Sequence, residues 1–279
     1  MRKITEQNKK AFKDYLYEEE KASATVNKYL RDLVDFQNYL GEEELKKSVV
    51  LSYKLELCKR YAPASVNAAL SSLGSFFLFM GWYDLKVKNL KIQKQIFSSG
   101  EKELTKNEYE KLLSAAKNKK DMRLFLLMQT ICSTGIRVSE VKFITVEAIE
   151  RGIAEISCKG KYRQVFLPRK LCLMLKQYTK NKKIESGSVF ITKNGNPLDR
   201  SNIWSEMKKL CHEANIPERK GFPHNLRHLF ARTYYSMQKD IVRLADILGH
   251  SSINTTRIYT MESGEIHLKQ IQNLDLLSV

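Results

Sequence analysis

Two short segments in the last third of the sequence carry side chains that could do chemistry on a phosphate. The first reads His-Asn-Leu-Arg-His from His224, and His224 and Arg227 share one face of a helix because they are three residues apart. The second runs from Leu248 through His250 to Tyr259. A guanidinium binds two phosphate oxygens in a fork, a histidine moves a proton near pH 7, and a phenol can attack. The combination predicts phosphate chemistry.

Two upstream segments add further cations to this set. Gly135 follows an apolar run that reads as a helix and would end it, so Arg137 lies at the turn that follows. Alternating apolar residues over 153–156 and 164–168 predict a β-hairpin, and Lys159 lies at its tip. The four segments together offer a nucleophile, a proton acceptor and several positive charges.

Helix ends are the elements that must position the second segment. Gly249 follows the apolar run 241–248, where a helix would end. Ser251 and Ser252 then offer an N-cap for a short second helix that would carry Tyr259. The spacing therefore predicts a helix, a tight turn and a second helix around the tyrosine.

These segments, in this order, resemble the tyrosine recombinase (phage integrase) family, and within it most closely the compact Xer-type enzymes. The motifs that carry the resemblance are Thr-Gly-Ile-Arg-Val-Ser-Glu, Lys-Gly in a hairpin, His-Asn-Leu-Arg-His, and Leu-Gly-His followed after eight residues by Tyr, across residues 133–260. The resemblance implies a catalytic set with a matching residue at every position: Arg137, Lys159, His224, Arg227, His250 and Tyr259.

The resemblance also implies a role for each member of the set. Tyr259 would be the nucleophile and would leave a 3′-phosphotyrosyl link and a free 5′-hydroxyl. Arg137 and Arg227 would clamp the nonbridging oxygens, where donors aimed at developing charge contribute roughly 10²–10³-fold each. His250 would add another donor, and His224 would accept the tyrosine proton.

The lysine is the position at which the sequence departs from the family pattern. Xer-type enzymes have Gly-Lys-Gly here, whereas Cys158 replaces the first glycine and the turn is one residue shorter. Lys159 is the expected proton donor to the leaving 5′-oxygen, with Lys161 as the alternative. Lys161 could instead bind phosphate alongside Arg163.

Two further residues are expected to support the catalytic set without touching the substrate. Glu140 lies one helical turn from Arg137, and His228 lies beside Arg227. Neither a metal ion nor another cofactor is implied by the resemblance, and the sequence shows no carboxylate cluster.

Composition points to a polyanionic partner. The chain has 279 residues, 48 Lys and Arg against 31 Asp and Glu, and a formal net charge of +17. Residues 1–50 include 10 basic and 10 acidic residues, so residues 51–279 carry all of the excess positive charge. The length predicts two domains, and the apolar content is sufficient for real cores.

Cysteine usage and hydropathy predict a cytoplasmic protein without a membrane segment. The five cysteines are odd in number and form no Cys-x-x-Cys motif, which argues against a disulfide framework and against a zinc site. The N-terminus has no apolar signal region, and no apolar run is long enough to span a bilayer.

Residues 1–85 are expected to form a four-helix domain, with helices at about 5–20, 22–40, 46–60 and 62–79. This region resembles, more loosely, the core-binding domain of the family, which clamps one face of the duplex. Small polar and basic residues can bond phosphate or base edges. The candidate DNA contacts are Lys28, Arg31, Ser65, Asn67, Ser71 and Ser72. An ordinary polar helix face explains any one of them equally well.

Residues 86–103 read as a basic linker in which Lys91 and Lys94 could lie along the phosphate backbone. Residues 104–279 are expected to form the catalytic domain. Its predicted elements are helices at 106–117, 122–133, 169–179 and 200–214, strands at 152–158 and 163–167, and a strand-and-turn insert at 189–197. A final amphipathic helix at about 263–277 would dock on a neighbouring protomer, as in the family.

The resulting fold class is mainly α with a small β-hairpin: a core-binding domain and a mixed α+β catalytic domain that close around DNA as a C-shaped clamp. The implied function is site-specific recombination by a homotetramer on two duplexes with inverted-repeat core sites. The sequence leaves open integration and excision, inversion or resolution, and any accessory protein. It carries no extra arm-binding domain of the kind found in larger phage integrases, which predicts sites without arm sequences.

Two other functions are compatible with part of these motifs. A type IB topoisomerase-like relaxing enzyme would share the chemistry, and a DNA-binding architectural protein could carry a catalytically silent site. The N-terminal helical clamp and the docking tail favour recombination over relaxation. The complete catalytic set disfavours a silent site.

Overall fold

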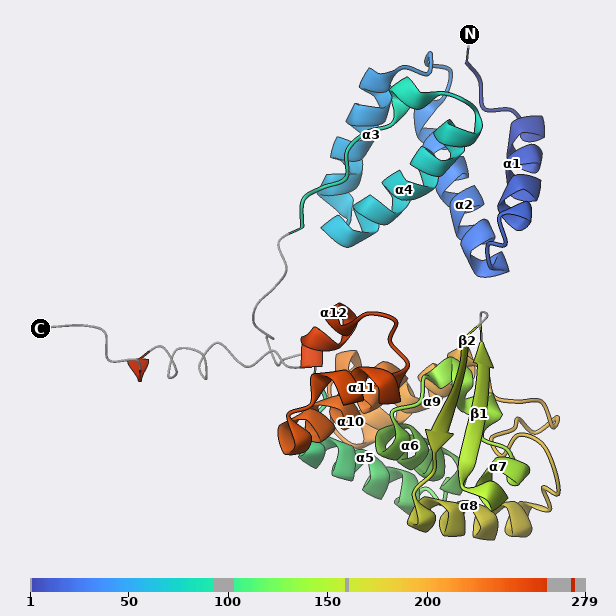
Figure 1. The fold of residues 1–279 in the computed structure, drawn as a ribbon, viewed down its shortest axis with the longest axis vertical. Coiled ribbons are helices and arrows are strands. Elements are labelled where there is room, and N and C mark those ends of the chain that lie inside the picture. Colours follow the sequence, from blue (N-terminus) through green and yellow to red (C-terminus); the bar gives the residue numbers. More distant parts are fainter. Residues whose placement is uncertain (1, 93–102, 159–160, 260–271, 274–279) are drawn as a thin grey trace, which may run out of the picture. The chain divides into compact units, whose positions relative to one another are not determined.

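The computed structural model of the chain describes residues 2–92, 103–158, 161–259 and 272–273 (Figure 1). Its contacts divide the chain into two compact units, Met1–Lys94 and Gln95–Val279, and each has its own buried core. The described residues are mainly helical with one two-stranded sheet, which confirms the prediction of a mainly α protein with a small β-hairpin. No helix within these ranges is long and apolar enough to cross a membrane.

The first unit is a bundle of helices in which α2 packs against α1, α3 and α4. All four predicted helices are present, with ends within a few residues of the expected positions. A single turn of 3₁₀ helix follows them. The bounds are α1 Glu6–Glu18, α2 Ser23–Leu40, α3 Lys47–Arg60, α4 Pro63–Phe79 and η1 Tyr83–Leu85.

Aromatic side chains fill the centre of this bundle. Phe12, Phe36, Phe76 and Phe77 are each at most 1% exposed. The rings of Phe12 and Phe76 meet edge to face with their centroids 5.2 Å apart. Burying each such side chain stabilises the folded unit by about 1.5–3 kcal/mol relative to leaving it in water.

The second unit contains the remaining described elements. In chain order they are α5 Lys106–Asn118, α6 Met122–Thr134, η2 Val138–Phe143, α7 Val146–Arg151, β1 Ile153–Cys158, β2 Lys161–Phe166, α8 Arg169–Lys182, α9 Arg200–Glu213, η3 Glu218–Lys220, α10 Pro223–Gln238, α11 Ile241–Leu248, α12 Ile253–Thr256 and η4 Arg257–Tyr259.

Helix α6 is the central element of the second unit, and it contacts α5, α8, α9 and α10. Residues 124–128 are all buried, as expected for a helix that is apolar on every side. Gly135 ends the helix in the left-handed conformation, with φ of 65°. A Cβ at this position would lie 2.5 Å from the Phe230 ring, so the close packing of α10 on α6 requires glycine.

Strands β1 and β2 form the predicted antiparallel hairpin. Their register runs from the pair Ile153–Phe166 to the pair Cys158–Lys161. Ala154, Ile156 and Val165 are buried while the residues next to them are exposed or half-buried, so one face of the hairpin lies on the core.

Two local features differ from the sequence-based expectation. The insert at 189–197 contains no full strand; Ile191 and Pro197 form an isolated bridge, and the Val189 N–H donates to the Ile144 carbonyl at 2.9 Å. Burial of Val189 and Phe190 explains the apolar pattern that looked like a strand. The short helix α7 was not predicted, because its six residues are too few to show a helical period.

Candidate active site

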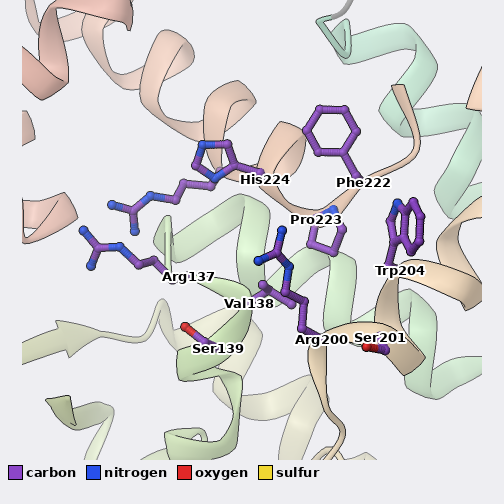
Figure 2. Close-up of a pocket in the computed structure, with 10 residues that line it drawn as sticks. Arg137, Val138, Ser139, Arg200, Ser201, Trp204, Phe222, Pro223 and His224 are labelled. Atoms are coloured by element: carbon purple, nitrogen blue, oxygen red, sulfur yellow. The ribbon is translucent and has the colours of Figure 1, made fainter. Parts of the chain in front are cut away.

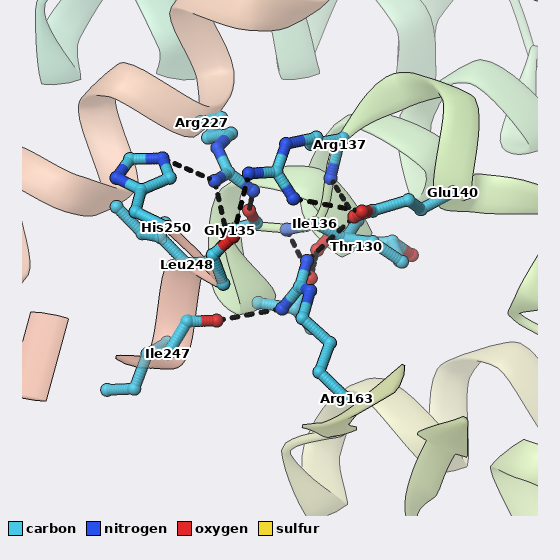
Figure 3. A network of polar contacts seen from close by, with 12 residues as sticks. Thr130, Gly135, Ile136, Arg137, Glu140, Arg163, Arg227, Ile247, Leu248 and His250 are labelled. Carbon is cyan, nitrogen blue, oxygen red and sulfur yellow. Dashed lines mark hydrogen bonds and ion pairs between the residues drawn. The ribbon is translucent and has the colours of Figure 1, made fainter. Parts of the chain in front are cut away.

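Helix α10 presents the two histidines and the arginine of the first motif. Pro223 occupies its first position, where a missing backbone N–H is harmless, so the helix begins directly before His224. Arg227 is only 1% exposed. Its Nη1 donates to the Gly135 carbonyl at 2.5 Å and its Nη2 to the Leu248 carbonyl at 2.7 Å (Figure 3). Arg227 therefore joins the ends of α6 and α11.

The Arg227 guanidinium is a buried cation held by neutral carbonyls. Burial lowers its pKa to about 10, and the positive charge of Arg137 acts in the same direction. Its Nε is buried and has no hydrogen-bond partner within the described ranges. The side chain is still charged at neutral pH, so an anion that enters the site would stabilise it.

Arg137 lies at the N-terminus of η2, where it is held by Glu140. The Arg137 backbone N–H donates to Glu140 Oε2 at 2.9 Å, and its Nη1 donates to Oε1 at 3.0 Å. Its Nη2 donates to the Gly249 carbonyl at 3.1 Å. Burial raises the pKa of Glu140, but the hydrogen bonds from Arg137 and the charge of Arg163 outweigh this and hold the pKa below its usual value. The carboxylate is therefore ionised and fixes Arg137.

Arg163 does not lie where a phosphate contact was expected. It points from β2 into the same network, where Nη1 donates to the Ile247 carbonyl at 2.8 Å and Nη2 to Glu140 Oε2 at 2.7 Å (Figure 3). Its side chain is 14% exposed. The sequence could not show this, because the partners lie 23 and 84 residues away.

His250 follows the left-handed Gly249, whose φ is 63°. Its Nε2 lies 3.0 Å from Arg227 Nη2, and its Nδ1 lies 2.9 Å from Thr256 Oγ1. Burial, followed by the charges of Arg227 and Arg137, lowers its pKa to about 4. The ring is therefore neutral at pH 7, with Nε2 accepting from Arg227 and Nδ1 donating to Thr256. Donation from Nε2 to a phosphate would need the other tautomer.

Tyr259 ends η4 and is 4% exposed. Its ring centroid lies 4.9 Å from that of His228, nearly perpendicular, and 6.3 Å from that of His250, nearly parallel. Burial raises the pKa of Tyr259, although the positive charge of Arg227 opposes this. The predicted Ser252 cap is present, since its side chain accepts from the Asn254 N–H. The turn predicted from Gly249 and Ser252 therefore places the tyrosine beside the histidines.

The rings of His224 and His228 are 4.4 Å apart on successive turns of α10. Burial lowers the pKa of His224, and the charges of Arg227, Arg137 and Arg200 add to this effect. Burial, the charge of His224 and that of Arg227 lower the pKa of His228 to about 4. The His228 Nε2 is buried and has no hydrogen-bond partner in the described part of the chain.

A pocket of about 800 Å³ opens beside these residues (Figure 2). Arg137, His224 and Arg227 line one part of it, and Arg200 and Trp204 of α9 line another. Neither α9 residue was expected in the site. The sequence does signal the start of α9, because Asp199 forms a capping box there, but not which helix start lies near Arg137.

Two of the six candidate DNA contacts, Ser72 and Asn67, are not fully exposed and are bonded to distant residues of the first unit. Ser72 is 1% exposed and donates to Asp32 Oδ2 at 2.6 Å. Asn67 bonds both the N–H and the carbonyl of Leu90, at 2.7 and 2.9 Å, and so fastens the chain after η1 to α4. The partners of Ser72 and Asn67 lie 40 and 23 residues away, so the sequence gives no local sign of these bonds.

The other four candidates are more accessible. Arg31, Ser65 and Ser71 are exposed, and Lys28 is half-buried and paired with Asp32. Lys28, Arg31 and Ser65 line a groove of about 700 Å³ between α2, α3 and α4.

Several expected residues cannot be placed. Lys159, Lys94 and the docking helix at 263–277, except residues 272–273, lie outside the described residues. Lys161 pairs through its backbone with Cys158, and Lys91 is exposed. The described ranges contain no group of three or more His, Cys, Asp or Glu that could hold a metal ion.

Comparison with known proteins gives matches over both units. Residues 102–265 match the model of the phage integrase family, and residues 10–82 match the phage integrase N-terminal SAM-like domain. The tyrosine recombinase XerA of Pyrococcus furiosus is 30% identical over 277 residues, which cover 95% of this chain and 93% of that protein.

Solved structures of related proteins share the fold. The XerH site-specific recombinase bound to its difH substrate matches with a TM-score of 0.70 and 20% identity, over 94% of this chain and 83% of that one. A lambda integrase tetramer bound to a Holliday junction matches with a TM-score of 0.71 and 18% identity, over 91% of this chain and 76% of that one. At these identities the likeness concerns the fold.

Proposed function

The chain belongs to the phage integrase family of tyrosine recombinases, and we propose that it is a site-specific DNA recombinase whose nucleophile is Tyr259. The observation that carries the proposal is the meeting of Arg137, Arg227, His250 and Tyr259 around one polar network. These residues come from η2, α10, the turn after α11 and η4. Such a set combines a phenol that can attack a phosphodiester with two guanidinium groups that can bind its oxygens.

In the proposed reaction, the Tyr259 oxygen attacks the phosphorus of one strand and the bond to the 5′-oxygen breaks. The protein then carries a 3′-phosphotyrosyl bond, and the other product is a free 5′-hydroxyl. His224 accepts the phenolic proton, and Lys159 gives a proton to the leaving oxygen. Because the new ester conserves the energy of the old one, a 5′-hydroxyl of a partner strand can reverse the step without ATP.

Positive side chains supply the charge that the pentavalent transition state needs. Arg137 and Arg227 bind its nonbridging oxygens, and donors of this kind each contribute roughly 10²–10³-fold. His250 adds a third donor. In this proposal neither a metal ion nor a cofactor takes part.

The proposed partner is double-stranded DNA with a specific inverted-repeat core site, and the proposed assembly is a homotetramer on two duplexes. The XerH structure holds its difH substrate, and the lambda integrase structure is a tetramer on a Holliday junction. By analogy, residues 1–85 would bind the core site, 86–103 would form the linker and 104–279 would cleave. The segment 263–277 would dock on a neighbouring protomer.

The test is formation of a covalent protein–DNA adduct. We expect the protein, incubated with nicked duplexes drawn from DNA flanking its gene, to give a band of reduced mobility on a denaturing gel. The Tyr259→Phe variant should bind the same DNA and give no band. A band that persists in the variant would assign the nucleophile elsewhere. No band on any DNA of a genome-wide pool, despite salt-sensitive binding, would favour a binding protein without catalysis.

A further inference from the structure

Arg163 is the cation of the network whose role the proposed reaction leaves unassigned. Its Nη1 and Nη2 are both bonded within the protein, and its Nε is buried without a partner in the described part of the chain. Both terminal nitrogens therefore donate within the protein, and the side chain is only 14% exposed. These bonds raise the question of what the side chain holds in place.

One group held by Arg163 is the carboxylate of Glu140. Oε2 accepts from Arg163 Nη2 at 2.7 Å and from the Arg137 backbone N–H at 2.9 Å, while Oε1 accepts from Arg137 Nη1 at 3.0 Å. The Glu140 side chain is 5% exposed and is shared by the two arginines. Removing Arg163 would leave a buried carboxylate with one cation and fewer constraints on the position of Arg137.

The other group is the turn that carries His250. Arg163 Nη1 binds the Ile247 carbonyl at the end of α11. The side chain also packs against Gly249, where a Cβ would meet Arg163 Cδ at 2.4 Å and Nε at 2.7 Å. The Gly249 carbonyl in turn accepts from Arg137 Nη2. Arg163 thus supports the same turn that Arg137 contacts.

We propose that Arg163 is a positioning residue for DNA cleavage, which ties β2 to Glu140 and to the turn after α11 and so keeps Arg137 and His250 at the spacing that a phosphate requires. The proposal rests on the proposed function. It differs in measurable ways from a direct phosphate contact. A contact residue would govern DNA affinity and its salt dependence, whereas a positioning residue governs the cleavage rate once the DNA is bound.

The experiment compares Arg163→Gln with Arg151→Gln in single-turnover cleavage of a nicked duplex at saturating protein. Arg151 is a matched control, because it lies just before β1, is 56% exposed and pairs with Glu155 on the surface. We expect Arg163→Gln to cleave about 10²-fold more slowly, the scale of losing one oriented donor. Its DNA affinity and the slope of log K against log salt should match the wild type. Arg151→Gln should cleave at the wild-type rate.

Two further variants show whether the cleavage rate depends on the shape of the Arg163 side chain or only on its charge. Arg163→Lys keeps the charge, but a single ammonium does not reproduce the planar fork that reaches two acceptors, so its cleavage rate should also fall. The effects of Glu140→Gln and Arg163→Gln on the cleavage rate should be non-additive, because both changes break the ion pair between Glu140 and Arg163. Arg163→Lys also serves as the test if Arg163→Gln fails to fold.

A readout without catalysis separates this proposal from the proposed function. In the free protein, hydrogen exchange of peptides over 247–252 should rise in Arg163→Gln and stay unchanged in Arg151→Gln. If the wild type forms no adduct, the proposed function fails, and the exchange result still decides the role of Arg163. A wild-type cleavage rate with weaker binding and a salt slope smaller by about 0.9 would show a phosphate contact instead. Unchanged exchange would also overturn the proposal.

Discussion

At the scale of single residues, partial burial and the neighbouring arginine charges keep the histidines of the site neutral. Together they lower the pKa of His224, and they lower the pKa of His228 and of His250 to about 4. A neutral imidazole can accept a proton at neutral pH, which suits the role proposed for His224. His250 is neutral for the same reason, so it can donate to a phosphate oxygen only from the ring nitrogen that carries the proton.

The half-buried His228 predicts that folding stability depends on pH. Its pKa is about 4 in the folded protein and close to 6.5 when unfolded, so the unfolded chain binds the proton more tightly. The stability it contributes is complete above pH 6.5 and is lost as the pH falls towards 4. Between pH 7 and pH 5 the free energy of unfolding should drop by about 2 kcal/mol through this residue.

Urea denaturation of the wild type and of His228→Asn at both pH values measures this contribution. The variant removes the titrating group, so its loss of stability between pH 7 and pH 5 should be smaller by about 2 kcal/mol. Equal losses in the two proteins would show that the pKa of His228 is the same in the folded and unfolded states, and so is not lowered by folding.

At the scale of elements, the junction of α6 and α10 depends on one glycine. Gly135 and Gly152 both have positive φ, 65° and 72°. A Cβ at Gly135 would lie 2.5 Å from Phe230, whereas a Cβ at Gly152 would meet nothing within 4 Å. Gly152→Ala should therefore lower the free energy of unfolding only by the left-handed penalty of about 1–2 kcal/mol.

Gly135→Ala has the same left-handed penalty, and its Cβ would also crowd the Phe230 ring. We expect its free energy of unfolding to fall by about 1–3 kcal/mol more than that of Gly152→Ala, which is the typical cost of overpacking. Denaturant midpoints of the two variants give the comparison. Similar midpoints would mean that α10 can move away from α6 without loss. Cleavage should also suffer in Gly135→Ala, since the Gly135 carbonyl holds Arg227.

Local signals predicted most elements and few of the side-chain partners. Gly249 and Ser252 marked helix ends that the structure confirms. The motif spacing grouped Arg137, His224 and Arg227, which line the candidate site, but gave no sign of Arg200 and Trp204. Arg163, by contrast, faces inward because Glu140 and α11 lie on that side, and no local pattern encodes a partner 84 residues away.

At the scale of the whole molecule, DNA affinity should depend strongly on salt, because the formal charge is +17. Arg31 is exposed in the groove of the first unit, whereas Asn67 is bonded to Leu90. Arg31→Gln should weaken binding and reduce the slope of log K against log salt by about 0.9, the release of one counterion. Asn67→Ala should leave the slope unchanged.

Fluorescence anisotropy of a labelled core-site duplex over a range of salt concentrations measures both slopes. A smaller slope for Asn67→Ala would mean that loosening Leu90 shifts basic residues of the following segment away from the DNA. An unchanged slope for Arg31→Gln would place the phosphate contacts of the first unit on other residues.

The acceptors that hold the arginines have a consequence for the genetics of the protein. Arg227 uses the carbonyls of Gly135 and Leu248, Arg137 uses that of Gly249, and Arg163 uses that of Ile247. A missense mutation changes a side chain and leaves the carbonyl in place. Leu248 and Ile247 can therefore be replaced by other apolar residues, and the arginines keep their backbone acceptors. Inactivating alleles that act through this network should instead concentrate at the arginines, at Glu140 and at the two glycines.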